Sequence, residues 1–437
     1  MLPLQGLLRT AKHNLVYQFR FEPDEWAPNI IPSGALFRSE RMSTVTPGVA
    51  FLVCPGGGAR LGYPSLKMPS ITRTAMLCLN LILLATAVYG DAVADLWNKG
   101  KPALDAQLAK SQTCTKDKLQ VRREWGDLTA ADKKAYIKAV LCVTSSPSKL
   151  DPTKYPGAKT RYDDFVAVHI NQTMSIHGTG NFLSWHRFYT WAYEQVLRNE
   201  CGYNGTQPYW DWGRWSASPE TSPIFDGSDT SMSGNGEKVA HQSFMAPAGN
   251  GGGCITSGPF KNMTVNLGPI SPAITPAPPR NPRSDGFGYN PRCLRRDISN
   301  YLSSRYTRTQ DIVGLISNST TIATFQNTMQ MAGVSMGVHS AGHFTIAGDP
   351  AGDFYVSPGD PAFYLHHAMI DRTWTIWQAQ DLQNRLQVIA GGRSMMGIGG
   401  AAASLNDEVN LYSVADRTWK ISELVSITDG PFCYTYA

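Results

Sequence analysis

A charge excess of one sign is missing from most of this 437-residue chain. Eight of its 39 Lys and Arg residues and four of its 34 Asp and Glu residues fall in residues 1–90, which leaves 31 basic and 30 acidic residues from 91 onward. A nearly neutral body lacks the single-sign field that attracts nucleic acid. The sequence therefore predicts no nucleic-acid partner.

A hydrophobic run long enough to cross a bilayer is missing at the most apolar segment, residues 75–88. This run has about 14 residues, whereas a membrane span needs about 20. Arg73 precedes it, as in a secretory signal. Ala85-Thr86-Ala87, near its end, is a small-residue cleavage pattern, and Val88-Tyr89-Gly90 is a second possible cleavage site. We therefore predict a signal peptide over 68–90, a secreted protein and no stable membrane anchor after cleavage.

Residues 1–67, which precede this segment, have weak periodicity and no clear helix or strand signal. Met68 stands where a natural start would lie. Our hypothesis is that 1–67 is not part of the mature protein, which would then be a single domain over 91–437.

Cys-x-x-Cys pairs, which would point to zinc, are also missing. The chain after residue 90 has an even set of cysteines: Cys114, Cys142, Cys201, Cys254, Cys293 and Cys433. In a secreted protein this set predicts three disulfides, and the 15 ways of pairing six cysteines stay open. The Asn-x-Ser/Thr sequons give glycosylation candidates at Asn171, Asn204, Asn262 and Asn318.

Three segments carry helix signals. Thr129 to Asp132 has a capping-box pattern that opens a helix. Aromatic and aliphatic residues recur at three- and four-residue steps from Phe182, and Gly202 should end that helix. Asp360 before Pro361 predicts an N-cap followed by an amphipathic helix to about residue 380.

Long irregular segments separate these helices. Residues 216–258 are rich in Gly and Ser, and residues 268–291 are rich in Pro. Loops of this length are unusual unless they are functional or stapled. Because Cys254 and Cys293 flank the proline segment, we expect disulfides to hold it on the surface. The fold class is mainly α, with a helical core wrapped by loops and little β-sheet.

Histidine is scarce, and its distribution is the strongest functional signal. Six of the nine histidines form two clusters, His169, His177 and His186, then His339, His343 and His367. His339 and His343 are four residues apart and share one helix face, where they can bind one metal. His13 and His241 read as ordinary residues.

The types of ligand residue restrict which metals the clusters can bind. Imidazole-only ligation suits copper, zinc, iron or nickel. Neither cluster has the carboxylate of non-haem iron or di-iron sites, and no His-Glu-x-x-His motif occurs.

These motifs resemble those of the tyrosinase and catechol oxidase family of type-3 copper proteins, in particular its short secreted fungal members. The resemblance runs from about Val121 to Tyr436 and is most specific at Trp185-His186-Arg187-Phe188 and at Asp360-Pro361-x-Phe363-Tyr364-x-x-His367-x3-Asp371. It implies a four-helix bundle that holds two copper ions. His169, His177 and His186 would bind copper A, and His339, His343 and His367 would bind copper B.

The resemblance also assigns roles around the ligands. Asp371 would orient an imidazole or pair with Arg187. Phe354 would gate the substrate over copper A. Gln330 and Ser340 take the positions where related tyrosinases have a glutamate and an asparagine that hold a water.

The chain departs from the family pattern at that water site. A neutral amide is a poor base, so Gln330 favours oxidation of o-diphenols over hydroxylation of monophenols. Ser175 replaces the cysteine that forms a thioether in many relatives. The chain ends after Tyr434-Thr-Tyr436, where relatives begin a shielding domain, so we expect no latency through such a domain.

The implied partners are O2 and a small phenol. An oxidase that also hydroxylates monophenols is the first alternative. A haemocyanin-like oxygen carrier with the same ligands is the second, and a histidine-rich zinc protein is the third.

Overall fold

The computed structural model describes residues 91–437 except 333–334 and 396–400. The predicted signal peptide over 68–90 and the segment 1–67 lie outside these residues. None of the helices in the described part is both long enough and apolar enough to span a membrane.

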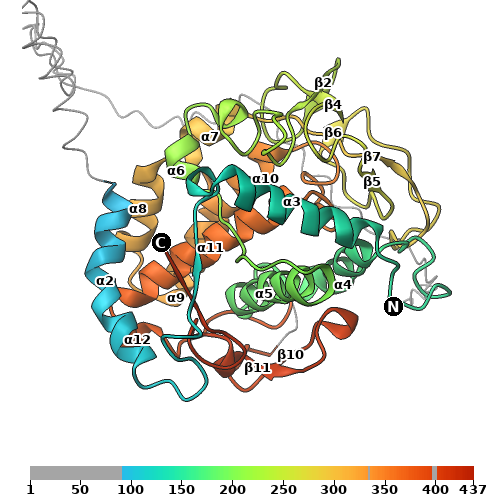
Figure 1. The fold of residues 1–437 in the computed structure, drawn as a ribbon. Helices are drawn as coiled ribbons and strands as arrows, with labels where there is room; N and C mark the ends of the chain where they lie inside the picture. The colour runs from blue at the N-terminus through green and yellow to red at the C-terminus, as the bar shows by residue number, and fades with distance from the viewer. Residues whose placement is uncertain (1–90, 333–334, 396–400) are drawn as a thin grey trace, which may run out of the picture. The chain divides into compact units, whose positions relative to one another are not determined.

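Four helices form the centre of the fold: α4 (Arg161–Ile176), α5 (Phe182–Cys201), α10 (Val338–Ile346) and α11 (Ala362–Ala379). Helix α11 packs against α5 and α10, and α4 packs against α5. Figure 1 shows α11 running through the middle, with α10 and α5 beside it. The prediction of a mainly α protein with a helical bundle is confirmed.

Two predicted helix ends are also confirmed. The hydroxyl of Thr129 accepts a hydrogen bond from the Asp132 N–H and caps α3 (Ala130–Ser145). Helix α5 ends at Gly202, whose φ of 66° lies in the left-handed region that glycine adopts without strain. Both ends depend on local backbone chemistry, which the sequence displays directly.

The prediction for α11 is correct in position and wrong in character. The N-cap is Pro361 and not Asp360 as predicted, so the regular helix begins one residue later, although the Asp360 carboxylate still accepts a hydrogen bond from the Ala362 N–H. All of its residues are buried, so α11 is not amphipathic. A helix that contacts neighbours on every side has no solvent face to keep polar.

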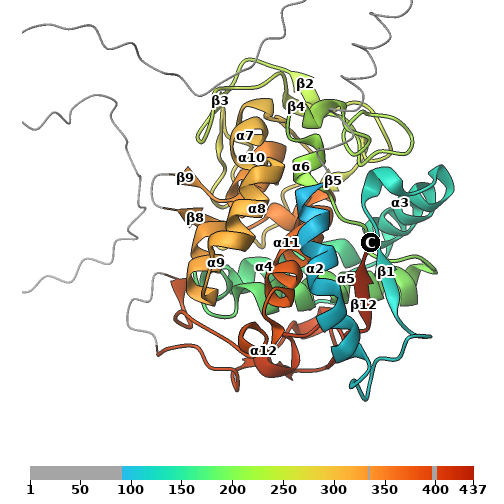
Figure 2. The same cartoon turned by 90° about the vertical axis from the view of Figure 1, so that its left-hand side faces the viewer.

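Outer helices cover this centre. Figure 2 shows α2, α8, α9 and α12 around α11. The outer helices are α2 (Ala92–Leu108), α3, α6 (Trp212–Trp215), α7 (Asn300–Tyr306), α8 (Thr309–Asn318), α9 (Ile322–Gln330) and α12 (Leu382–Arg385).

The strands of the described residues are short and occur only in pairs, as the expectation of little sheet requires. One pair is parallel: β1 (Gln120–Arg122) lies beside β12 (Tyr434–Tyr436). The antiparallel pairs are β2 (Gly236–Lys238) with β4 (Gly252–Ile255), β3 (Gln242–Ser243) with β6 (Ile274–Thr275), β5 (Thr264–Val265) with β7 (Arg292–Cys293), β8 (Met331–Ala332) with β9 (Ser335–Met336), and β10 (Glu408–Val409) with β11 (Trp419–Lys420).

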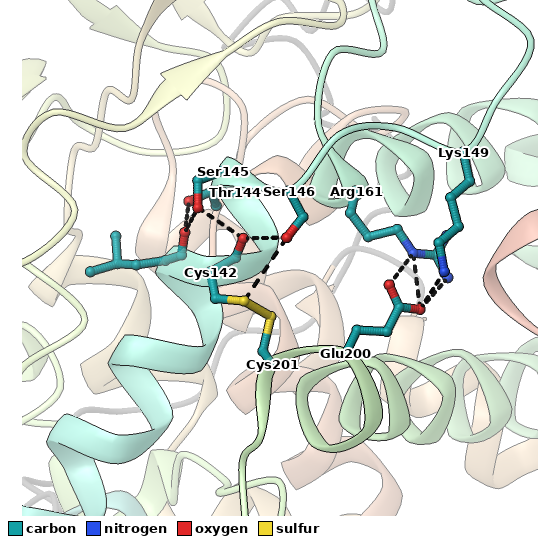
Figure 3. The surroundings of a disulfide bond; sticks show 9 residues. Cys142, Thr144, Ser145, Ser146, Lys149, Arg161, Glu200 and Cys201 are labelled. Carbon is teal, nitrogen blue, oxygen red and sulfur yellow. Dashed lines mark hydrogen bonds and ion pairs between the residues drawn. A yellow bond between two sulfur atoms is a disulfide. The ribbon is translucent and has the colours of Figure 1, made fainter.

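Three disulfides staple the loops and helices, as predicted. The pairs are Cys114–Cys433, Cys142–Cys201 and Cys254–Cys293. The last pair closes the proline segment, in agreement with expectation. Figure 3 shows Cys142 at the end of α3 bonded to Cys201 at the end of α5.

Candidate metal centre

The first histidine cluster lies between α4 and α5. His169 is inside α4, His177 is the residue that ends α4, and His186 is in the first turns of α5. Each Nδ1 lies 2.8–2.9 Å from a backbone carbonyl oxygen, that of Tyr355 for His169, Thr173 for His177 and Phe182 for His186. A neutral ring that donates from Nδ1 keeps a free lone pair on Nε2.

Those free nitrogens are the signature of a ligand set. The Nε2 atoms of His169 and His186 are buried without a hydrogen-bond partner among the described residues. A buried polar atom left unpaired needs an explanation. A bound metal ion would give each of these nitrogens a partner.

The second cluster converges in the same way. His339 and His343 lie one turn apart on α10, and His367 lies on α11. The Nε2 of His343 is 3.2 Å from that of His339 and 3.1 Å from that of His367. Such spacings fit three nitrogens around one ion at about 2.0–2.1 Å, the usual metal–imidazole distance.

The two clusters face each other. The rings of His186 and His367 stack with centroids 4.6 Å apart, and the rings of His177 and His339 stack at 6.3 Å. Six imidazoles from four helices therefore meet inside the helical centre, where bundle proteins build metal sites.

Burial keeps these imidazoles neutral. It lowers the pKa of His177 to about 4 and of His343 to about 3, and it lowers the pKa of His169, His186 and His339 well below the ordinary value. His367 behaves in the same way. Neutral imidazole is the form that binds metal, so the donor set fits two copper ions.

His366 is a seventh buried imidazole next to this site, within ligand distance of the second cluster. The Trp212 indole N–H donates to its Nδ1 at 3.1 Å. In the neutral ring the proton must then sit on Nε2, which leaves no lone pair on that nitrogen for a metal. This bond, which sequence reasoning missed, favours His367 over His366 as the ligand.

Asp371 and Arg187 form a buried ion pair behind the histidines. Arg187 Nε lies 2.5 Å from Asp371 Oδ1. The other oxygen accepts from Arg122 at 3.4 Å, Tyr434 at 2.6 Å and Tyr436 at 2.5 Å. Of the two roles predicted for Asp371, the structure favours pairing with Arg187, because arginine and tyrosine donors occupy the carboxylate.

A cavity of about 310 Å³ opens beside the histidines and contains the predicted gate and water-site residues. The Phe354 ring lies 4.5 Å from that of His177. The side-chain oxygen Oε1 of Gln330 accepts a hydrogen bond from the Gly178 N–H at 2.9 Å. The Ser340 hydroxyl donates to the backbone carbonyl of Gln330 at 2.5 Å. Gln330 is thus half-buried and held in place in the cavity lining.

The sequon asparagines Asn171, Asn204, Asn262 and Asn318 are all exposed. Exposure is what glycosylation requires, and their modification stays a prediction. Asn171 lies on α4, where its amide donates to the Tyr155 hydroxyl at 2.8 Å.

Known proteins share this arrangement. A family model described as "Common central domain of tyrosinase" matches residues 159–380. Tyrosinase P of Aspergillus terreus is 39% identical over 336 residues, which cover 73% of this chain and 92% of that protein. N-acetyl-6-hydroxytryptophan oxidase of Emericella nidulans is 37% identical over 367 residues, covering 76% and 96%.

A solved structure agrees as well. A polyphenol oxidase from Thermothelomyces thermophila, solved as a mutant, has a TM-score of 0.74 and 38% sequence identity. The match covers 79% of this chain and 97% of that one.

Proposed function

Because this chain belongs to the tyrosinase family, and is therefore a type-3 copper oxidoreductase, we propose that it oxidises o-diphenols to o-quinones with O2. Each catechol gives up two electrons and two protons, and two catechols reduce one O2 to two waters. We further propose that monophenols are hydroxylated slowly or not at all.

The copper pair would be held by His169, His177 and His186 on one side and by His339, His343 and His367 on the other. Bound there, it supplies the exchange of electrons between phenol and O2. The carbonyl bonds at Nδ1 fix the direction of each copper A imidazole, so little reorganisation is needed when substrate enters.

The preference for diphenols rests on one observation, the amide of Gln330 at the mouth. A monophenol must lose its proton before hydroxylation, and a positioned base contributes about 10²- to 10⁴-fold to such a step. Gln330 is neutral and already accepts the Gly178 N–H. The one carboxylate of the described cavity lining, Asp353, accepts three backbone N–H groups.

Oxygen uptake by the copper-loaded protein tests this proposal, with 4-methylcatechol compared with 4-methylphenol. We expect immediate uptake with the catechol and little with the phenol. Comparable uptake with the phenol and no lag would overturn the preference. Binding of O2 without turnover of catechol would support the oxygen carrier instead.

The variant Gln330→Glu sharpens the test, because it places a carboxylate at the mouth. We expect it to raise monophenol hydroxylation about a hundredfold, the low end of the effect of a positioned base. Gln330→Met is the control, since it removes the amide and supplies no base. If the glutamate variant gains nothing over the methionine variant, the assignment of Gln330 is wrong.

We also propose that the protein is secreted. Three disulfides and four exposed sequons suit an oxidising compartment. N-terminal sequencing of the protein recovered from medium tests this, and a mature chain that begins before Met68 would refute the proposed processing.

A further inference from the structure

The described lining of the cavity beside the histidines is mostly apolar or uncharged. Its apolar side chains include those of Phe344, Phe354 and Met395. Gly178, which has no side chain, and the uncharged amide of Asn327 also line it. Neither Lys nor Arg is among the described lining residues. A substituent on a bound phenol would therefore meet carbon surface and neutral dipoles.

Asp353 is the one acid in that described lining, and backbone N–H groups already occupy both of its carboxylate oxygens. One oxygen accepts the N–H groups of Ile270 and Ser271 at 2.8 and 2.7 Å, and the other accepts the Tyr355 N–H at 2.9 Å. The side chain is fully buried. It offers little to a cation in the cavity.

The surrounding sequence adds no charge either. Residues 312–348, which include all of α9 and α10, contain no Asp, Glu, Lys or Arg. Arg393 is close in sequence to Met395, but its guanidinium is paired with Asp407 at 2.6 Å. The described lining and residues 312–348 therefore supply no basic side chain, and their one carboxylate is Asp353.

Such a surface penalises a charged substrate, because an ammonium or carboxylate loses water there and gains no partner. We propose that the cavity selects uncharged catechols with an apolar substituent and discriminates against charged ones, phenolic amino acids included. This inference rests on the proposed catechol oxidation and names its substrate class.

Matched substrates test it at pH 7. N-acetyldopamine differs from dopamine by loss of the ammonium charge, and methyl 3-(3,4-dihydroxyphenyl)propanoate differs from its free acid by loss of the carboxylate charge. We expect kcat/KM to be about tenfold higher for the neutral member of each pair, the size expected for a polar group buried without a partner. Equal values, or a preference for either charged member, would overturn the inference.

Failure of the proposed function looks different, because none of the four catechols would then sustain oxygen uptake. A binding measurement separates the two cases further. Phenethylamine and N-acetylphenethylamine have no hydroxyl to oxidise, so saturation-transfer NMR with the copper-loaded protein reports binding alone. We expect much stronger transfer to the acetylated compound, and equal transfer to both would contradict the selectivity.

Charge variants at Asn327 locate the effect. Asn327 is exposed on α9 and lines the cavity. Asn327→Asp should improve kcat/KM for dopamine relative to its acetyl form, and Asn327→Lys should do the same for the acid relative to its ester. Thr328→Asp is the control, because the next residue lines a different hollow. A control that shifts as much as Asn327→Asp would show that the cavity is not the selecting surface.

Discussion

At the scale of single residues, proton position separates two adjacent histidines. Trp212 donates to Nδ1 of His366, whereas Nε2 of His367 points at Nε2 of His343. Both rings are fully buried and both have a lowered pKa because of that burial. The difference between them therefore lies in which nitrogen is free, and burial does not distinguish them.

The variants His367→Gln and His366→Gln test this difference. We expect the first to lose about half of the bound copper, since one of two triads loses a ligand. Groups outside the ligand set typically change metal affinity by only about 10–100-fold. The second should keep two copper ions per chain, because a glutamine oxygen can accept the Trp212 N–H. Copper analysis after dialysis measures both, and equal loss in the two variants would contradict the assignment.

His241, which no sequence pattern singled out, forms a buried pair with Asp297. Its Nε2 lies 2.7 Å from Asp297 Oδ2, and its Nδ1 donates to the Val239 carbonyl. Burial opposes the charge, and Arg295 does so too, but Val239 and Asp297 together raise the pKa of His241 above the ordinary histidine value. The pair anchors the loop that leads from β2 to β4, because Asp297 also accepts the Gly249 and Gly251 N–H groups of that loop.

Stability should follow this pKa. A raised histidine pKa stabilises the folded chain fully below the unfolded value of about 6.5 and loses that contribution as pH rises through the folded pKa. We expect the Tm gap between the native protein and His241→Gln to be widest near pH 6 and to narrow toward pH 8.5. Thermal melts across this range measure it. A gap that widens with pH would show that the sign is wrong.

At the scale of elements, one loop connects the cavity with the proline segment. Phe354 and the Tyr355 carbonyl contact His177 and His169, and the neighbouring Asp353 binds the N–H groups of residues 270 and 271. Burial raises the pKa of Asp353 to about 6, so its carboxylate is ionised at neutral pH and depends on these donors.

Asp353→Asn should loosen both segments. Asparagine has one acceptor oxygen, so its NH2 group must face either Tyr355 or the 270–271 pair of donors. An unpaired buried donor costs about 1–3 kcal/mol, and we expect amide exchange at residues 270, 271 and 355 to speed up about tenfold. Asp285→Asn is the control, because Asp285 is half-exposed and pairs with Arg283. Equal exchange in the two variants would contradict the role of Asp353.

The elements also show what the sequence can predict. Caps such as Thr129 and Gly202 depend on neighbours within a few residues, and these were predicted. The burial of all of α11 depends on helices that contact it from distant parts of the chain, and the amphipathic prediction for it was wrong. Local sequence therefore predicts where helices end, whereas tertiary packing decides which helix faces are exposed to solvent.

In the metal site, likewise, the sequence could predict the candidate ligands but not the groups that orient them. The number and spacing of the histidines are enough to indicate the two clusters. The groups that orient them, such as the Tyr355 carbonyl at His169 and the Trp212 indole at His366, come from segments 186 and 154 residues away in sequence. A backbone carbonyl carries no side-chain signal, so residue types alone could not have indicated the first of these.

At the scale of the whole molecule, the first and last strands of the described chain are joined next to the ion pair of Asp371. Strand β1 pairs with β12, and Arg122 from the first strand shares Asp371 with Tyr434 and Tyr436 from the last. Asp371 lies one turn after His367 on α11. The closure of the chain and the placement of the ligand helix therefore depend on one buried carboxylate.

One disulfide, Cys114–Cys433, secures the same closure, and the other two close much shorter segments within the chain. Cys114–Cys433 spans 319 residues, Cys142–Cys201 spans 59 and Cys254–Cys293 spans 39. Figure 3 shows that the middle bridge has polar support nearby, since Glu200 binds both Arg161 and Lys149 beside it. These differences allow the source of disulfide stability to be separated from local packing.

Loop entropy predicts that the longest closure matters most. Restricting the unfolded chain is worth about 6 kcal/mol for the first bridge and about 4 kcal/mol for each of the others. We expect the serine pair Cys114→Ser with Cys433→Ser to lower the free energy of unfolding by roughly 1–2 kcal/mol more than Cys142→Ser with Cys201→Ser, measured by urea titration. The pair Cys254→Ser with Cys293→Ser is the control, since its loop is the shortest. If the Cys142–Cys201 variant is instead the least stable, contacts between α3 and α5 in the folded state decide the effect, and restriction of the unfolded chain does not.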